Sequence, residues 1–194
     1  GLCGDAGQTA QVFPTDIGYR RITVECRGHG LSEAGAFDAF SIETFANDVL
    51  HYLDETGLET PVIGGISMGA AIALRLVVQH PGRFKALVLA RPAWIVESGP
   101  ENLFPNAMAG KLLEELPPSK AAAEFEGSAA AELLAQRGPD NLNSIRSFFA
   151  REPAAATSQL LQRISADGPG VSEDEIRRIA VPARTMRRRD SRFW

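Results

Sequence analysis

Cysteine, histidine and long apolar runs are scarce in this sequence, and the shortages exclude whole classes of protein. Only two cysteines, Cys3 and Cys26, occur in 194 residues. This is too few for the disulfide framework of a small secreted domain, so we expect buried, reduced thiols and a cytoplasmic protein. No stretch approaches the roughly 20 apolar residues that cross a bilayer, and the amino end lacks the order of a secretory signal. We therefore expect a globular protein with no membrane partner.

Positive charge is also scarce outside the last residues. The whole chain carries a formal charge of −4, but residues 1–183 contain 15 basic and 23 acidic side chains and carry −8. A body this acidic gives no reason to expect nucleic acid as a partner. The arginine-rich stretch from residue 184 onward shows little periodicity, and we interpret it as a solvated terminus.

The apolar residues, 44% of the chain, alternate between strand and helix periods. The predicted order is strand 22–26 ("ITVEC"), helix 41–57, strand 60–65, helix 68–82 and strand 84–90. Ser41 is placed to cap the first helix, Gly57 to end it, and Pro81 to stop the second. Strands joined by single helices at such short spacing run parallel, with right-handed crossovers. The pattern predicts an α/β protein with a parallel sheet and helices on both faces.

The hydrophobic pattern of the sequence changes near residue 96, where strand-like periodicity stops and helical periodicity continues. We predict helices over 104–116, 119–136, 141–151 and 154–166. A block of helices inserted into an α/β sheet indicates a cap. Four of its apolar residues are candidates for the wall of a binding site, or equally for the core of the cap itself: Met108, Leu112, Phe148 and Phe149. After it, a short helix in "VSEDEIRRIAVPA" leads back to a strand that begins near Val181 and Pro182.

The segment Gly65-Ile66-Ser67-Met68-Gly69 carries the chemistry of the chain. It places a serine where an apolar strand passes directly into a helix, and this forces a tight, strained turn at the carboxyl edge of the sheet. The glycines remove side chains that would collide there. A serine hydroxyl needs a base to become a nucleophile, and the oxyanion formed on attack needs N–H donors, of which the Met68 amide at the helix start is the first candidate. The alternative is a glycine-rich turn with an incidental serine.

Four stretches of the sequence resemble the α/β-hydrolase fold superfamily, in its capped esterase- and lactonase-like branch. They are "GGISMGAA" (64–71), "ECRGHGLSE" (25–33), "QHPGRFKALVLARPA" (79–93) and, more faintly, "GLCGDAGQ" (1–8). The resemblance implies that Gly1 belongs to an oxyanion loop and that the Leu2 amide is the second oxyanion donor. It divides the chain into a core over 1–95, a helical cap over 96–170 and a return to the core over 171–194.

The resemblance also implies a catalytic acid and a histidine base near the carboxyl end, where this sequence departs from the pattern. Asp190 falls near the expected position of the acid, although three arginines precede it, and no histidine follows. His29 lies in a turn after an early strand, where a structural role is the rule, and His51 and His80 lie far along their helices from the serine. "ARTMRRRDSRFW" is unfit for a buried central strand. We therefore expect an incomplete chain in which the histidine base is absent.

These inferences lead to one function and two alternatives. The expected function is a serine hydrolase that acts on a small carboxylic ester or lactone through an acyl-enzyme at Ser67, with no metal and no organic cofactor. Within the same fold, a perhydrolase, a C–C bond hydrolase or an acyltransferase is equally compatible with the serine. In the third hypothesis the chain is a catalytically dead remnant that keeps only the pocket.

Overall fold

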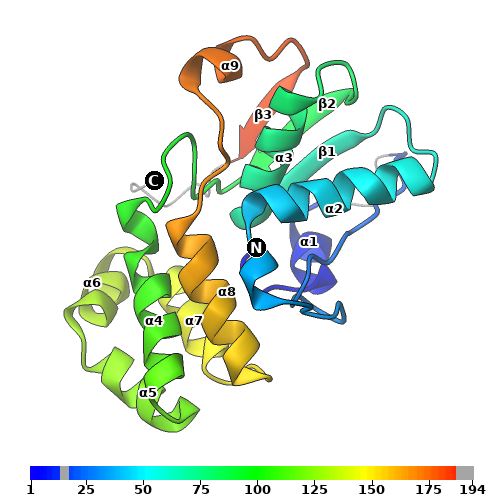
Figure 1. Cartoon of the computed structure of the whole chain (residues 1–194). Helices are drawn as coiled ribbons and strands as arrows, with labels where there is room; N and C mark the ends of the chain where they lie inside the picture. The colour runs from blue at the N-terminus through cyan, green and yellow to red at the C-terminus, as the bar shows by residue number, and fades with distance from the viewer. Residues whose placement is uncertain (14–17, 187–194) are drawn as a thin grey trace.

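The computed structural model describes residues 1–13 and 18–186, and Asp190 lies outside them. Over this part of the chain, helices and strands alternate up to residue 90, and helices alone follow until residue 177 (Figure 1). The elements are α1 (Ala6–Val12), α2 (Ile42–Glu55), β1 (Val62–Ile66), α3 (Met68–Gln79), β2 (Ala86–Ala90), α4 (Phe104–Glu115), α5 (Pro118–Glu126), α6 (Ala129–Arg137), α7 (Pro139–Phe148), α8 (Ala154–Ala166), α9 (Glu173–Arg177) and β3 (Ala183–Met186), with short 3₁₀ turns at Phe37–Ala39 and Glu101–Leu103.

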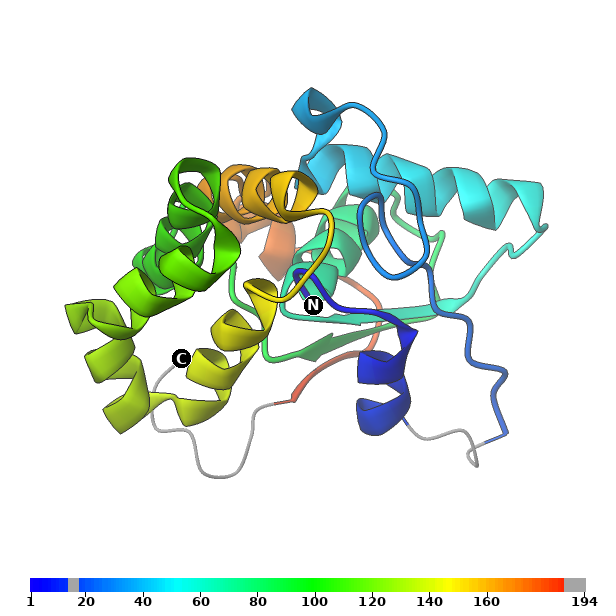
Figure 2. The same cartoon turned by 90° about the horizontal axis from the view of Figure 1, so that it is seen from below.

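The sheet has three parallel strands in the order β1-β2-β3, which confirms the predicted α/β class. Val62 pairs with Ala86, and Leu87 pairs with Ala183. Helices α2 and α3 cover one face of the sheet, and α1 lies against the other (Figure 2). Helix α3 is apolar nearly all round because it is sandwiched between the sheet and α2, and Leu76 on α3 is 1% exposed.

Helix α2 forms as its sequence predicts. Ser41 accepts a hydrogen bond from the Thr44 amide at 2.9 Å, which satisfies one donor of the first turn. The carboxylate of Asp167, far along the chain, accepts a second hydrogen bond of this turn from the Ile42 amide at 2.6 Å. Gly57, with φ +66°, ends the helix. The junction therefore ties the start of α2 to the segment that leaves α8.

The prediction of a strand over 22–26 is wrong. These residues are extended but pair with no other described segment, and their polar groups bond to α1 instead. The hydroxyls of Thr23 and Thr9 lie 2.8 Å apart, and the Glu25 carboxylate accepts from the Ala6 amide at 2.8 Å. An apolar, β-branched run becomes a strand only when a neighbour offers its backbone groups.

The helices α4–α8, hereafter the α4–α8 block, stand to one side of the sheet (Figures 1 and 2). The single helix predicted over 119–136 is in fact two, α5 and α6. The break falls at Gly127 and Ser128, because Ser128 caps α6 by accepting from the Ala131 amide. Helices α4 and α8 cross closely at Gly110, whose carbonyl accepts from the Ser158 hydroxyl at 2.8 Å.

The chain returns to the sheet as predicted, through a short helix and a last strand. Ser172 and Glu175 form a reciprocal capping box at the start of α9. Strand β3 follows Pro182, and all four of its residues are exposed. The polar run after Pro182, unsuited to a central strand, therefore pairs at the rim of the sheet, where Arg184 and Thr185 meet solvent.

No helix in the described part of the chain is long and apolar enough to span a membrane.

Candidate active site

Ser67 occupies the turn between β1 and α3. Its φ of +52° and ψ of −109° lie in a region that residues other than glycine rarely adopt. The turn is held on both sides. The Ser67 amide donates to the Ala90 carbonyl of β2 at 2.9 Å, and the Ser67 carbonyl accepts from the Ala70 amide at 3.0 Å. Strain of this kind costs about 1–3 kcal/mol and persists only where the surroundings impose it.

Gly65 makes the turn possible because the start of α3 folds directly onto it. A Cβ on Gly65 would lie 2.0 Å from the Gly69 carbonyl carbon and 2.6 Å from its Cα. A Cβ on Gly64 would meet the Val88 carbonyl oxygen at 2.7 Å. The same expectation for Gly69 is wrong, since a Cβ there would meet nothing within 4 Å. Gly69 contributes its backbone to the contact, and Gly65 must lack the side chain.

A cleft of about 270 Å³ opens beside Ser67, between the sheet and the α4–α8 block. Its walls come from the amino-terminal turn, from α1, from the end of β2 and from α7. The lining residues beyond the backbone of the turn are mostly amides, hydroxyls and apolar groups: Gln8, Gln11, Val12, Asn102, Leu103, Asn106, Leu134, Asn141, Ser144, Ile145, Ser147 and Phe148.

Of the four predicted wall residues, only Phe148 lines this cleft. Phe149, the next residue, points into the block and packs on Phe125 with ring centroids 5.7 Å apart. Met108 and Leu112 pack against the core of the block. Helical periodicity identifies an apolar face but does not say which apolar face meets a cavity.

The amino-terminal residues form the part of the wall nearest the serine. A Cβ on Gly1 would lie 3.9 Å from the Ser67 Cβ and 3.8 Å from the Ile66 carbonyl oxygen. The Gly4 amide donates to the Gly1 carbonyl at 3.0 Å, which closes a turn with Leu2 and Cys3 at its centre. Neither the Leu2 amide nor the Met68 amide has a hydrogen-bond partner among the described residues. Both oxyanion candidates thus belong to segments that meet beside Ser67.

None of the three histidines lines the cleft. His29 is 3% exposed, its Nδ1 lies 2.9 Å from the Arg27 carbonyl, and burial lowers its pKa to about 4. His51 is exposed, and its Nε2 lies 3.1 Å from the Glu55 Oε1. His80 is the C-cap residue of α3, at the end of this 12-residue helix that is about 18 Å away from Ser67. Among the described lining residues there is also no aspartate or glutamate. The base and acid of a serine hydrolase are therefore not in this part of the cleft.

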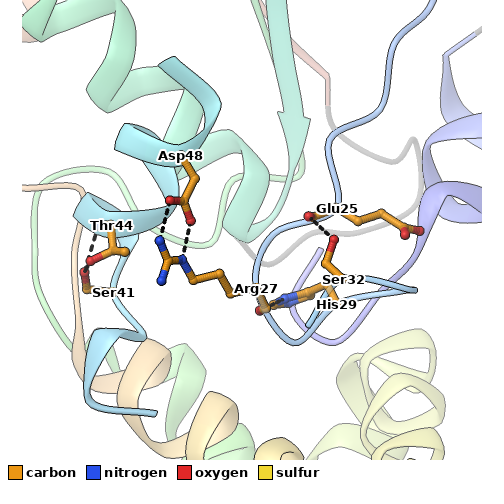
Figure 3. A network of polar contacts seen from close by, with 7 residues as sticks. All are labelled: Glu25, Arg27, His29, Ser32, Ser41, Thr44 and Asp48. Atoms are coloured by element: carbon orange, nitrogen blue, oxygen red, sulfur yellow. Dashed lines mark hydrogen bonds and ion pairs between the residues drawn. The ribbon is translucent and has the colours of Figure 1, made fainter. Parts of the chain in front are cut away.

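The turn that contains His29 is a structural element, as predicted (Figure 3). Arg27 donates two hydrogen bonds to Asp48 of α2, at 2.6 and 2.8 Å. The Ser32 hydroxyl donates to the Glu25 carbonyl at 2.7 Å. These contacts fix the turn against α2, and the buried Nε2 of His29 has no hydrogen-bond partner among the described residues.

Sequence reasoning missed Arg91, which has the only charged side chain among the described residues that line the cleft. It directly follows β2 with φ +48°, and its Nη2 donates to the Asn141 side chain of α7 at 2.9 Å. The contact joins the sheet to the α4–α8 block across the cleft. Its position was a usable signal, because the carboxyl ends of neighbouring parallel strands lie at one edge of a sheet, and Arg91 ends the strand beside β1.

The described residues contain no cluster of three or more histidine, cysteine, aspartate or glutamate side chains that could hold a metal ion.

A strained serine between a parallel strand and a helix, beside a cleft under a helical block, defines a class of protein. The family model described as "alpha/beta hydrolase fold" matches residues 1–170, and the chain belongs to that family.

Particular relatives cover parts of the chain. A non-heme chloroperoxidase, CPO-A1, from Kitasatospora aureofaciens is 33% identical over 122 residues, which are 58% of this chain and 44% of the relative. A monoglyceride lipase from Homo sapiens is 30% identical over 106 residues, 52% of this chain and 34% of the lipase. The crystal structure of the enol-lactonase from Burkholderia xenovorans LB400 superposes with a TM-score of 0.55 at 28% identity, covering 82% of this chain and 58% of the lactonase. The chain thus spans less than two thirds of each of these proteins.

Proposed function

We propose that Ser67 is the nucleophile of a hydrolase that acts on a small carboxylic ester or lactone. The observation that carries the proposal is the strained turn, which holds a serine against the cleft wall in a conformation that a serine adopts only when imposed. In the reaction, Ser67 Oγ bonds to the carbonyl carbon, the alcohol leaves with a proton, and water then releases the acid from the acyl-enzyme. The lipase and lactonase relatives support this substrate class.

The Met68 and Leu2 amides are the proposed oxyanion donors. Both are unpartnered among the described residues, and each lies on a segment that contacts the Ser67 turn. The Met68 amide also lies at the start of α3, where the helix dipole favours negative charge. Two fixed N–H groups of this kind stabilise a tetrahedral intermediate more than the ground-state carbonyl.

We propose that residues 96–170 act as a cap over a core formed by residues 1–95 and 171–194. The cap supplies much of the cleft wall, including Ile145 and Phe148, so it would select the substrate. Two free cysteines are compatible with the reducing cytoplasm that we expect for this protein.

The acid and base are the open part of the proposal. Asp190 stays a prediction outside the described residues, and no histidine lines the described cleft. Without a base, turnover falls by several orders of magnitude although binding and the oxyanion donors remain. We therefore expect this chain to react at Ser67 with activated reagents and to turn over ordinary esters slowly.

Peroxide-dependent chemistry at the same serine is a second candidate, because the relative that matches 58% of this chain is named a chloroperoxidase. Here an acyl-enzyme would be attacked by hydrogen peroxide in place of water. An assay for peracid, with acetate and hydrogen peroxide as substrates, distinguishes it from simple hydrolysis.

The test is labelling with a fluorescent alkyl fluorophosphonate, followed by intact mass and peptide mapping. We expect one adduct, on Ser67, and loss of at least about a thousandfold in labelling rate for Ser67→Ala. Added imidazole should accelerate the reaction by supplying the base. Ser144→Ala is the matched control, because Ser144 also lines the cleft but its hydroxyl donates to the Asp140 carbonyl at 3.0 Å.

Labelling on Ser144, or no labelling of a protein that circular dichroism shows to be folded, would overturn the proposal. The second of these results favours a pocket that binds without catalysis.

A further inference from the structure

Arg91 lies beside Ser67 at the carboxyl edge of the sheet. Strands β1 and β2 are paired so that Ile66 lies opposite Ala90, and the Ser67 amide donates to the Ala90 carbonyl at 2.9 Å. Ser67 and Arg91 are the next residues after this pair. Because neighbouring strands lie about 4.8 Å apart, the proposed nucleophile and the arginine occupy adjacent positions on one edge.

The backbone of Arg91 is held in an unusual conformation. Its φ of +48° lies in the left-handed region, which residues other than glycine rarely adopt. Its amide donates to the Met186 carbonyl of β3 at 2.9 Å, and its Nη2 donates to the Asn141 Oδ1 of α7 at 2.9 Å. The sheet therefore fixes the backbone of Arg91, and the α4–α8 block fixes its side chain. Strained residues of this kind cluster at active sites and ligand-binding positions.

The guanidinium brings positive charge to the wall of the cleft. Its contact with Asn141 does not cancel that charge, because the Asn141 side chain is a neutral amide. A guanidinium also stays protonated at any pH at which the protein is folded. The other described side chains that line the cleft are amides, hydroxyls, a thiol and apolar groups, with no aspartate or glutamate among them. The described wall of the cleft therefore favours a negatively charged ligand over a neutral one.

Two helices begin at the same cleft and act in the same direction. Ser67 is the N-cap residue of α3, and Leu103, the N-cap residue of α4, lines the cleft together with Pro105 and Asn106 of the first turn. Neither helix has an acidic side chain in its first turn, and in neither does the N-cap side chain accept a hydrogen bond from that turn. The amino end of a helix attracts negative charge, so both helix dipoles reinforce the charge of Arg91.

We propose that Arg91 is a specificity-determining residue that binds a carboxylate on the acyl part of the substrate, so that the ester or lactone attacked by Ser67 is an anionic one. The inference rests on the proposed function of Ser67. The planar guanidinium matches a carboxylate, which can accept two parallel N–H···O bonds from it. A half-ester of a short dicarboxylic acid presents both groups at once, its ester carbonyl to Ser67 and its carboxylate to Arg91.

The experiment compares the acylation of Ser67 by two activated esters of equal chain length. One is p-nitrophenyl hydrogen adipate, which carries a carboxylate, and the other is its neutral methyl ester, p-nitrophenyl methyl adipate. Release of p-nitrophenolate gives the second-order rate of each, and intact mass with peptide mapping locates the acyl group. The measured quantity is the ratio of the anionic to the neutral rate, divided by the same ratio for imidazole in solution. We expect this ratio to be about ten to a hundred in the parent, as for a hydrogen bond between charged groups.

The variants change the charge of Arg91 without changing its backbone strain. Arg91→Gln removes the charge but keeps an N–H donor for Asn141, and Arg91→Lys keeps the charge without the planar fork. At φ +48°, glutamine and lysine are as strained as arginine. We expect the ratio to fall about tenfold or more in Arg91→Gln and to be retained in part by Arg91→Lys. Arg146→Gln is the matched control and should keep the parent ratio, because Arg146 is exposed on α7, pairs with Glu126 at 2.6 Å and does not line the cleft.

Each other outcome overturns a stated part of the reasoning. If Ser67 is acylated but the parent and Arg91→Gln have equal ratios, or the parent favours the neutral ester, the role of Arg91 is overturned and the nucleophile proposal stands. If Arg146→Gln loses the ratio as well, overall charge sets the preference, and the role of Arg91 is again overturned. If neither the esters nor the fluorophosphonate label Ser67 of the folded parent, both proposals fall.

A competition experiment on the parent keeps the test decisive if Arg91→Gln does not fold. Adipate should slow the phosphonylation of Ser67, and the neutral adipamide at the same concentration should not. Equal effects of the two compounds would overturn the carboxylate site.

Discussion

Replacing Gly65 with alanine should damage the protein far more than the same change four residues later at Gly69. The new Cβ at position 65 would lie 2.0 Å from the Gly69 carbonyl carbon and 2.1 Å from its oxygen. The obstacle is backbone, so no side chain can rotate away. Position 65 is also fixed by its register opposite Leu89, and the Ser67 amide is bonded to Ala90.

Overpacking that side chains can absorb costs about 1–3 kcal/mol, so we expect at least about 3 kcal/mol for Gly65→Ala. In a protein of this size, each kcal/mol lowers the melting temperature by roughly 2–4 °C, which predicts a fall of about 6–12 °C or failure to fold. Gly69→Ala meets no atom within 4 Å and lies inside α3. It should be neutral or stabilising by up to about 1 kcal/mol, because alanine favours a helix over glycine.

The assay is urea denaturation followed by circular dichroism, with thermal melts beside it. The two alanines should differ by about 4 kcal/mol, with opposite signs. Equal effects, or a Gly65→Ala protein within about 1 kcal/mol of the parent, would refute the geometry of the turn on which the nucleophile proposal depends.

Two more predictions concern His29 and Gly110. Burial lowers the pKa of His29 to about 4, whereas in the unfolded chain the imidazole is protonated near pH 6.5. The free energy of unfolding should therefore decrease as the pH drops from 6.5 to 4, by up to about 3 kcal/mol. His29→Asn should flatten that slope in urea titrations at several pH values, and an unchanged slope would show that other groups cause it. Gly110→Ala would place a Cβ 2.8 Å from the Leu161 Cβ and should cost about 1–3 kcal/mol in thermal melts. Gly127→Ala, with no atom closer than 3.7 Å, should change little, and equal effects of the two would argue against the close helix crossing.

The described part of the proposed site holds candidate groups for binding and for oxyanion stabilisation, but no candidate base or acid lines it. Ser67, the two amides and the cleft meet in one place, whereas all three histidines lie away from it. Reagents that acylate or phosphonylate a serine therefore test Ser67 independently of turnover.

Local sterics and capping let the sequence determine much of this protein by itself. The Ser67 turn, the Ser41 cap and the capping box at Ser172 each depend on residues a few positions apart, so their patterns are readable in one dimension. The α/β class followed from the alternation of strand-like and helical hydrophobic periodicity along the sequence.

Contacts between distant segments were decided only by the tertiary structure. Residues 22–26 have a strand-like sequence but pair with no strand in the described part of the chain. Arg91 and Arg151 donate to Asn141 and Gly28, which are 50 and 123 residues away. Such contacts depend on which groups the folded chain brings within hydrogen-bond range and on which groups it removes from water. Neither quantity is a property of a short stretch of sequence, because burial and partners are set by the whole packing arrangement.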